Sequence, residues 1–298
     1  MLNQLALQNL RGQLQQNEPM SKHTTWRVGG MADWFYKPAD SQDLMTLMQQ
    51  LPPELPIFWL GLGSNLLVRD GGLRGLVIAT SGLLNEIKLL DNAQLYVEAG
   101  VSCAKVARFA SQQGLDGIAF LAGIPGTMGG ALAMNAGAFG GETWESVTQV
   151  KTLNRQGQIH TRLPANYDIG YRHVKGHDNE WFLAATLQLK TQIDENQKAK
   201  IKALLQKRND TQPIGLPSCG SVFRNPPGDY AARLIEQAGW KGYCLGGACV
   251  SEKHANFIIN QNNATAKEIE ALIHRVQADI KARTGITLQY EVKIIGSQ

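Results

Sequence analysis

A short run in the last third of the chain brings together residue types that could transfer a proton. In the segment 217–226, the hydroxyl group of Ser221 lies between a glycine and an aromatic residue, and Arg224 and Asn225 come next. Such a mixture of small, charged and amide-bearing residues suits neither a core nor a linker. We therefore interpret Ser221 as a candidate proton donor. The simpler alternative is that a Gly-Ser pair forms a turn.

Two glycine-rich segments could hold a nucleotide cofactor. The first runs from Gly61 to Leu66, where Gly63 completes a Gly-x-Gly turn and Ser64 and Asn65 add side-chain donors. Glycines allow backbone N–H groups to approach an anion closely. The segment is not a Rossmann fingerprint, because the third glycine and the following helix are missing. A tight turn between two strands is the alternative interpretation.

The second segment, residues 123–142, consists almost entirely of small side chains. A glycine costs roughly 0.5–1 kcal/mol against alanine in regular structure, so this density indicates close approach to an extended ligand. Tight packing of a small-residue helix is the alternative. Together the two segments predict one long cofactor with a central diphosphate. The candidate cofactor-binding residues are Gly61, Gly63, Ser64, Asn65, Leu66, Gly123, Pro125, Gly126, Thr127, Gly129, Gly130, Asn135, Ala136 and Gly137.

Composition excludes several other classes of function. The chain has 298 residues, 43% hydrophobic and 18% charged, which is ordinary for a soluble globular protein. No apolar run approaches the ~20 residues of a membrane helix, and we expect no secretion signal. The net charge of +4 is spread along the chain, so we expect no nucleic-acid partner. The four cysteines lack a CxxC pair and are interpreted as reduced thiols of a cytoplasmic protein.

The region from about residue 26 to 190 is glycine-rich and apolar, and we expect short strands interrupted by two helices. Asp40 predicts the N-cap of the first helix, and Ser102 predicts the N-cap of a second helix that ends at Gly114. Apolar and β-branched content predicts strands at 57–60, 76–79, 95–98, 147–153 and 182–189.

From about residue 194 the predicted helices are longer and more charged. We expect helices at 194–209 and 229–238, and Thr265 opens a capping-box match before a third. The apolar face of that helix is Ile269, Leu272, Ile273, Val276 and Ile280. Alternation over 286–295 predicts a final strand whose other face carries Glu291. The fold class is therefore α+β, with a region 1–195, split near residue 80 into two α+β subdomains, and a region 196–298.

The combination of these motifs resembles the MurB family, the UDP-N-acetylenolpyruvylglucosamine reductases of bacterial cell-wall synthesis. The resemblance covers essentially the whole chain in order. Its matching pieces are the segments 24–30, 61–68, 123–141, 171–172, 220–226 and 290–296. Some members of the family carry an inserted loop with a tyrosine after the position of Arg172. This chain is short there and resembles the subclass that lacks the loop.

The resemblance implies a non-covalently bound FAD in a fold similar to the vanillyl-alcohol-oxidase (PCMH-type) flavoproteins. The FAD-binding region would be 1–195, and residues 196–298 would form an α+β substrate-binding domain. It also implies NADPH as hydride donor and the enolpyruvyl ether of UDP-N-acetylglucosamine as substrate. The product would be UDP-N-acetylmuramate, a peptidoglycan precursor. No metal, membrane or obligate protein partner is expected.

The implied reaction delivers a hydride from flavin N5 to C3 of the enolpyruvyl group and a proton to C2. The negative charge that develops at C2 and the carboxylate must be stabilised. Arg172 matches the family's active-site arginine, and its guanidinium fork suits a carboxylate. Glu291 matches the family's catalytic glutamate, and Ser221 is the expected proton donor. On residue types alone, Arg172 could instead be a surface arginine and Glu291 a solvated strand residue.

The remaining candidates concern substrate recognition. They are Tyr171, Arg208, Gln212, Arg224, Asn225 and His254. A polar helix end explains Arg208 and Gln212 equally well, and a histidine such as His254 is more often structural. Two other functions stay open: another flavin oxidoreductase or oxidase on the same scaffold, and a non-catalytic nucleotide-binding protein. The first would not need Glu291 or the segment 220–226, and the second would leave all three catalytic candidates without a role.

Overall fold

The computed structural model describes residues 7–191 and 197–298. The chain forms two compact units, each assembled from separate segments. Unit 1 consists of Met1–Gln15, Trp34–Gly61 and Gly75–Leu205, and unit 2 of Gln16–Asp33, Leu62–Arg74 and Gln206–Gln298. The predicted division into 1–195 and 196–298 therefore missed two N-terminal segments of unit 2. These two segments belong to unit 2 because they contribute to its core. Trp26 and Leu67 are fully buried in the same hydrophobic cluster as Phe223 and Leu272.

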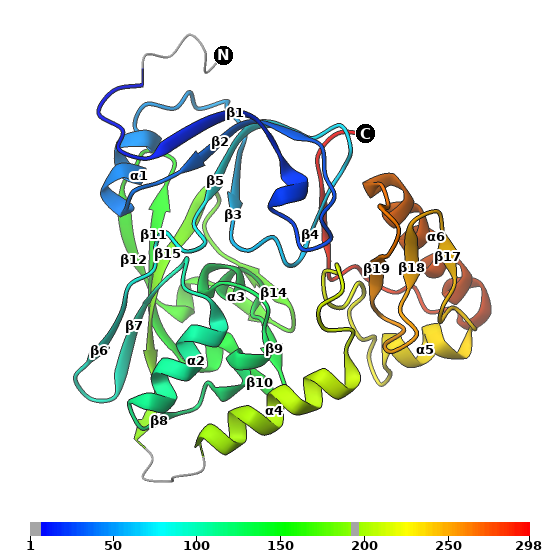
Figure 1. Ribbon diagram of the computed structural model, residues 1–298. Coiled ribbons are helices and arrows are strands. Elements are labelled where there is room, and N and C mark those ends of the chain that lie inside the picture. The colour runs from blue at the N-terminus through cyan, green and yellow to red at the C-terminus, as the bar shows by residue number, and fades with distance from the viewer. Residues whose placement is uncertain (1–6, 192–196) are drawn as a thin grey trace. The chain divides into compact units, whose positions relative to one another are not determined.

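A four-stranded sheet has the strand order β1-β2-β5-β3 (Figure 1). Its strands are β1 (Gln13–Pro19), β2 (Met31–Lys37), β5 (Leu73–Ala79) and β3 (Ile57–Leu60). Strands β3 and β5 pair in parallel, and both contain a strand expected from the sequence. Helix α1 (Ser41–Met48) begins after Asp40, whose side chain accepts a hydrogen bond from Asp43 N at 2.9 Å, so the predicted N-cap is confirmed.

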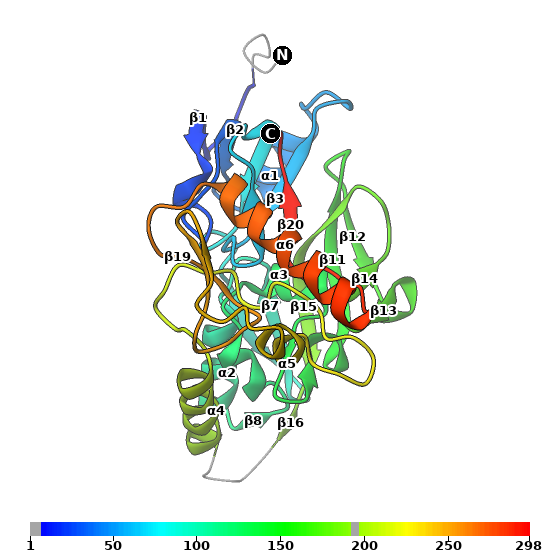
Figure 2. The ribbon, with the colours of Figure 1, turned by 90° about the vertical axis from the view of Figure 1, so that its right-hand side faces the viewer.

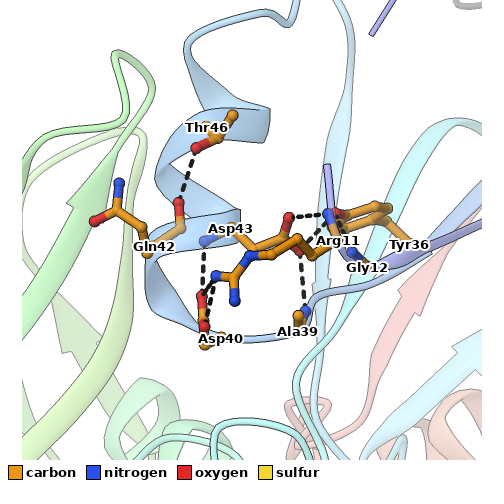
Figure 3. A network of polar contacts seen from close by, with 8 residues as sticks. All are labelled: Arg11, Gly12, Tyr36, Ala39, Asp40, Gln42, Asp43 and Thr46. Carbon is orange, nitrogen blue, oxygen red and sulfur yellow. Dashed lines mark hydrogen bonds and ion pairs between the residues drawn. The ribbon is translucent and has the colours of Figure 1, made fainter. Parts of the chain in front are cut away.

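The start of α1 is held by a buried carboxylate (Figure 3). Asp43 is 1% exposed and accepts hydrogen bonds from Arg11 N at 2.7 Å, Tyr36 Oη at 2.5 Å and Ala39 N at 3.0 Å. The Arg11 guanidinium binds the capping Asp40 and holds the pKa of that carboxyl below its usual value. Three donors satisfy the buried charge, so the network fixes the N-terminal segment of unit 1 against α1.

The second sheet of unit 1 is antiparallel throughout and has the order β12-β11-β15-β7-β6. Its strands are β12 (Ile159–Arg162), β11 (Val147–Asn154), β15 (Glu180–Gln188), β7 (Gln94–Glu98) and β6 (Ile87–Leu90). Helices α2 (Cys103–Gln112) and α3 (Met128–Met134) share a hydrophobic core with it. The predicted N-cap of α2 is confirmed, because Ser102 Oγ accepts from Lys105 N.

Short elements complete unit 1. They are β8 (Leu115–Asp116), η3 (Ala119–Gly123), β9 (Gly137–Ala138), β10 (Gly141–Glu142), η4 (Thr143–Glu145), η5 (Pro164–Asn166), β13 (Asp168–Gly170), β14 (His173–Lys175) and β16 (Lys190–Thr191). Helix α4 (Gln197–Thr211) contains the division between the units. The prediction for this helix began at residue 194, so its first part lies outside the described residues.

Unit 2 has its core around α6 (Ala266–Thr284), the long orange-to-red helix in Figure 2. The capping box at Thr265 is confirmed, and all five residues of the predicted apolar face are buried. A three-stranded antiparallel sheet, in the order β17-β18-β19, packs against this core. The other elements are η2 (Met20–Lys22), β4 (Leu66–Val68), α5 (Ala231–Gln237), β17 (Cys244–Leu245), β18 (Ala248–Val250), β19 (Ile258–Asn260) and β20 (Lys293–Ile295).

The predicted final strand, 286–295, is regular only in β20, which pairs in parallel with β4. In the described residues 285–292, before β20, Tyr290 makes a single bridge, to Phe223, so no ladder forms in this stretch. The predicted alternation still holds, because Leu288 and Val292 are buried in the core of unit 2.

Two cysteines differ from the prediction of four reduced thiols. Cys244 and Cys249 are joined by a disulfide across the β17–β18 hairpin, with their Cα atoms 4.1 Å apart. They are direct cross-strand neighbours, which the spacing along the chain did not reveal. Cys103 and Cys219 are free and buried. In the part of the chain that the structure describes, no helix has the length and apolar character needed to span a bilayer.

An ion pair fastens the loop after β4 to α6. Arg69 donates from Nε and Nη2 to Glu270 at 2.9 and 2.7 Å, and from Nη1 to the carbonyl of Gly296 at 3.1 Å. The hydrogen bond from Arg69 holds the pKa of the Glu270 carboxyl below its usual value. A carboxyl with a lowered folded-state pKa stabilises the fold above its unfolded-state pKa, and this contribution is lost as the pH falls through the folded-state value.

We therefore expect Glu270→Gln to lower the free energy of unfolding by about 1–3 kcal/mol near neutral pH. The difference from the unsubstituted protein should shrink once the pH drops below about 4, where glutamates protonate. Urea unfolding at a series of pH values measures this difference in the free energy of unfolding. Glu236→Gln, which removes only an exposed pair with Lys241, is the control and should change little. A difference that stays constant with pH would show that the charge of Glu270 is not its source.

Candidate active site

The segment that carries Ser221 is anchored from within unit 2. Val222 and Phe223 are each 1% exposed and belong to the core, whereas Ser221 itself is half-buried. Gly220 has φ +74°, a value that favours glycine, and nothing lies near the position of an added Cβ. The two buried neighbours therefore fix the backbone on one side of the hydroxyl, and a glycine in the left-handed region sets the turn on the other.

The structure brings Glu291 next to this segment. The N–H of Glu291 donates to the carbonyl of Val222 at 2.8 Å, and the rings of Phe223 and Tyr290 lie 5.8 Å apart. Burial raises the pKa of the Cys219 thiol, and the charge of Glu291 raises it further. Ser221 and Glu291, 70 positions apart in the sequence, thus belong to one backbone network.

The first glycine-rich segment also supports Glu291. Asn65 donates from Nδ2 to the carbonyl of Glu291 at 3.0 Å, and its own carbonyl accepts from Lys293 N at 3.0 Å. At Gly63, with φ +67°, a Cβ would lie 2.0 Å from the carbonyl oxygen of His23, so only glycine fits. The structure therefore gives Asn65 and Gly63 positioning and packing roles that the sequence analysis missed. Ser64 and Leu66 are half-buried in the same turn.

The second glycine-rich segment lines a cavity in unit 1. Thr127 caps α3 by accepting a hydrogen bond from Gly130 N at 3.4 Å. A cavity of about 280 Å³ opens there. The predicted cofactor-binding residues that line it are Gly61, Thr127, Gly129 and Gly130. Cβ atoms added at Gly61 and Gly129 would lie 2.6 Å from Thr127 Oγ1 and 2.9 Å from Ala99 Cβ, so the wall tolerates no larger residue at either position.

Two aromatic side chains in the cavity wall carry polar atoms with no partner. Trp59 Nε1 and Tyr167 Oη are buried, and neither has a hydrogen-bond partner among residues 7–191 and 197–298. The Trp59 ring stacks on Trp181 at 5.6 Å between centroids. Buried donors are normally satisfied, so this pair indicates a polar ligand. Cofactor pockets generally measure ≈ 300–1,000 Å³, so this cavity fits part of a dinucleotide. The sequence offered one signal, because Trp59 lies two positions before the first glycine-rich segment.

The other predicted cofactor residues do not line this cavity. A Cβ at Gly123 would meet the ring of Phe139 at 2.7 Å. Asn135 has φ +45°, ends α3, and is 2% exposed. Its Oδ1 accepts from Trp144 N at 3.1 Å, and its Nδ2 donates to Glu142 at 2.8 Å and to the Gly170 carbonyl at 3.1 Å. These contacts give Asn135 a structural role. The other predicted cofactor-binding residues of the second glycine-rich segment that do not line the cavity are Pro125, Gly126, Ala136 and Gly137.

Arg172 is held in position within unit 1. It lies in the turn between β13 and β14 with φ +52°, which is uncommon for a residue other than glycine. Its guanidinium donates to the carbonyls of Gly137 at 2.6 Å and Asn135 at 3.4 Å. The same group lies 5.0 Å from the ring centroid of Tyr171, which is 47% exposed. Gly137 thus contributes through its carbonyl, as an acceptor for Arg172.

The candidate substrate-binding residues of unit 2 have different surroundings. Arg208 donates to Gln212 at 3.2 Å, and burial lowers the pKa of Arg208. Arg224 Nε is buried without a hydrogen-bond partner in the described chain. The Oδ1 of Asn225 accepts from Ala231 N at 3.1 Å, at the start of α5. Arg224 is therefore the strongest candidate of the four for an anionic ligand.

His254 is half-buried, and its ring lies 4.7 Å from that of Phe257. Its Nδ1 accepts a hydrogen bond from Asn256 N at 3.3 Å, and burial lowers the pKa of the imidazole. The neutral ring can then offer an Nε2–H donor. A second cavity of about 500 Å³ lies in unit 2 beside the disulfide, and none of the predicted substrate-binding residues lines it.

Comparisons with known proteins show which families the chain is similar to. The model of an FAD binding domain matches residues 32–162, and that of the C-terminal domain of UDP-N-acetylenolpyruvoylglucosamine reductase matches residues 212–295. Curated reductases of this name from Alkalilimnicola ehrlichii and Legionella pneumophila are 55% and 57% identical. Each alignment covers 96% of this chain, and 95% and 93% of the respective relative.

A solved structure gives the same result. The crystal structure of UDP-N-acetylenolpyruvylglucosamine reductase (MurB) from Thermus caldophilus superposes with a TM-score of 0.83 at 31% identity. The match covers 96% of this chain and 99% of the other. Fold and cofactor domain define an FAD-dependent oxidoreductase, and the α+β class is confirmed. The chain belongs to the UDP-N-acetylenolpyruvoylglucosamine reductase family.

Proposed function

We propose that this enzyme uses NADPH to reduce the enolpyruvyl ether of UDP-N-acetylglucosamine to UDP-N-acetylmuramate. The relatives' printed name supports the reductase activity on the enolpyruvyl sugar. The observation that carries the proposal is the backbone network around Val222, which holds Ser221 and Glu291 together. An oxidase of small alcohols would need neither residue there. The product would enter the reactions that build peptidoglycan precursors.

FAD, when bound, supplies the hydride that adds to C3 of the enolpyruvyl group. Ser221 gives its hydroxyl proton to C2, and the pair of electrons released from the double bond forms the new C–H bond. An aliphatic alcohol is a weak acid, so it donates usefully only to a strong base such as this carbanion. The serine alkoxide must then regain a proton from water. Hydride and proton together saturate the double bond.

We assign the stabilisation of negative charge on the substrate to Arg172 and Glu291. Arg172 stays protonated at any working pH, and its fork can bind the substrate carboxylate in two places. Its bonds to Gly137 and Asn135 and its stacking on Tyr171 support the idea that it is held ready for this contact. We assign Glu291 a role in stabilising the negative charge that develops on the substrate, because it lies beside the Ser221 segment.

We assign the nucleotide part of the substrate to the polar residues of unit 2. The orphan Nε of Arg224 and the part-buried Arg208 support contacts to the diphosphate. Asn225, Gln212 and His254 would add hydrogen bonds, and Tyr171 would contact the acceptor near Arg172. We further propose that the enzyme acts in the cytoplasm without a membrane partner, a nucleic-acid partner or an obligate protein partner. Thiol reductants there would act on the Cys244–Cys249 disulfide.

The experiment that tests the function is an anaerobic assay of the FAD-loaded protein. NADPH oxidation should require the UDP-enolpyruvyl sugar and should yield UDP-N-acetylmuramate in equal amounts. A parallel reaction in air without the sugar tests the oxidase alternative. Turnover of oxygen in that control, or failure of the sugar to reoxidise the reduced enzyme, would overturn the proposal.

A further inference from the structure

We propose that Asn256 is a positioning residue that fixes the Ser221 hydroxyl for proton transfer. The inference rests on the function proposed above and adds to it a residue outside the catalytic set. Asn256 is 3% exposed, so its side chain contacts protein groups rather than substrate, and its effect must pass through its neighbours. It lies 35 positions after Ser221, in the loop between β18 and β19.

Asn256 makes three hydrogen bonds to the two residues that follow Ser221. Its Oδ1 accepts from Phe223 N at 3.0 Å, and its Nδ2 donates to the Phe223 carbonyl at 2.8 Å. Its own carbonyl accepts from Val222 N at 2.9 Å. The side-chain amide thus pairs with the N–H and the carbonyl of one residue, Phe223, as a neighbouring strand would. The N–H groups of Val222 and Phe223 and the carbonyl of Phe223 belong to buried residues. Leaving any of these groups without a partner would therefore cost free energy.

These contacts matter because they hold the two residues that directly follow Ser221. The segment 219–222 belongs to no helix or strand, and Gly220 before the serine is open to other conformations. On one side, the chain before β20 holds it, through Glu291 N to Val222 O at 2.8 Å and Arg224 N to Gln289 O at 2.8 Å. On the other side Asn256 supplies the bonds. The backbone that follows the serine is therefore held between Asn256 and the segment before β20 that carries Glu291.

The loop of Asn256 is itself well fixed, as a positioning residue requires. Its backbone N–H donates to His254 Nδ1 at 3.3 Å, and Phe257 N donates to the His254 carbonyl at 3.0 Å. Ser251 N closes the loop by donating to the Phe257 carbonyl at 2.9 Å. Ala255 and Phe257 on either side are buried. A fixed amide can therefore transmit its position to the Ser221 backbone.

The test compares the two half-reactions of Asn256→Ala in the FAD-loaded enzyme by anaerobic stopped flow. Reduction of the flavin by NADPH should stay within about twofold of the unsubstituted enzyme. Reoxidation by the UDP-enolpyruvyl sugar should slow by about 10²-fold, the scale expected when a reacting group is displaced by ~1 Å. The KM for the sugar should change little. Asn260→Ala removes two comparable side-chain bonds, to Trp26 O and from Ala264 N, and is the matched control.

A double-mutant cycle separates positioning from loss of stability. In a Ser221→Ala background the hydroxyl is already absent, so Asn256→Ala should slow reoxidation by less than about threefold more. Equal slowing in both backgrounds, or an equal loss in both half-reactions, would assign Asn256 a structural role only. If Asn256→Ala does not fold, the near-isosteric Asn256→Asp replaces it, and normal reoxidation in that variant overturns the inference.

The outcomes also distinguish this inference from the proposed function. If the unsubstituted enzyme is not reoxidised by the sugar, the function fails and the inference fails with it. If the unsubstituted enzyme is reoxidised and Asn256→Ala matches its rate, only the role of Asn256 is lost.

Discussion

Ser221→Ala is expected to leave reduction of the flavin by NADPH nearly unchanged and to slow reoxidation by the UDP-enolpyruvyl sugar by about 10²- to 10⁴-fold. A positioned general acid contributes that much to a proton transfer. The substitution removes the hydroxyl alone, because Val222 and Phe223 hold the backbone through their own buried contacts. Stopped-flow absorbance of the flavin measures both half-reactions on one sample.

Ser218→Ala is the control for this experiment. It removes a hydroxyl from the same segment, in which the backbone of Ser218 forms a bridge to Ile259. Both half-reactions should then match those of the unsubstituted enzyme. Near-normal reoxidation in Ser221→Ala would remove the serine from the mechanism and would require another donor for C2.

Arg172→Lys should lower kcat/KM for the sugar by about 10- to 100-fold, while the flavin is still reduced by NADPH. A charge-assisted hydrogen bond contributes about 1.5–3 kcal/mol, and an ammonium group cannot reproduce the two-pronged contact to a carboxylate. Lysine would also lose the paired bonds to Gly137 and Asn135 that hold the guanidinium over Tyr171. Steady-state kinetics with the sugar varied at saturating NADPH gives the ratio.

The matched control is Arg108→Lys, which exchanges the same residue types on α2, where the exposed arginine donates to the carbonyl of Ala104 one turn before it. It should have no effect on kcat/KM. A normal kcat/KM for Arg172→Lys would mean that only positive charge matters at that position, and a bidentate contact would be excluded.

The local elements of this fold were predictable because their signals are local. Asp40, Ser102 and Thr265 each cap the helix expected of them, since a side-chain oxygen at an N-cap needs only the next few backbone N–H groups. The apolar face of α6 follows in the same way from its period. Strand pairing depends on partners far away, so the single predicted strand at the C-terminus was divided between Phe223 and β4.

The candidate site shows the same limit. The glycines signalled close approach, but the sequence could not say whether a ligand or the protein itself comes close. At Gly63 it is the carbonyl of His23, and at Gly61 it is the side chain of Thr127 beside the cavity. The bond between Asn65 and Glu291 joins residues 226 positions apart, and the cysteine pair depends on the register of a hairpin. Neither leaves a periodic trace in the sequence.

The composition of the core of unit 2 constrains how this protein can fold while it is being synthesised. The indole of Trp26 donates to the carbonyl of Ile258 at 2.7 Å, and Val292 closes the same cluster. Domains generally fold as units while the nascent chain emerges. Here the core combines residues from both ends of the chain, so Trp26 cannot reach its native surroundings until nearly the whole chain has been synthesised. Chaperone capture of that early segment would protect the chain during this interval.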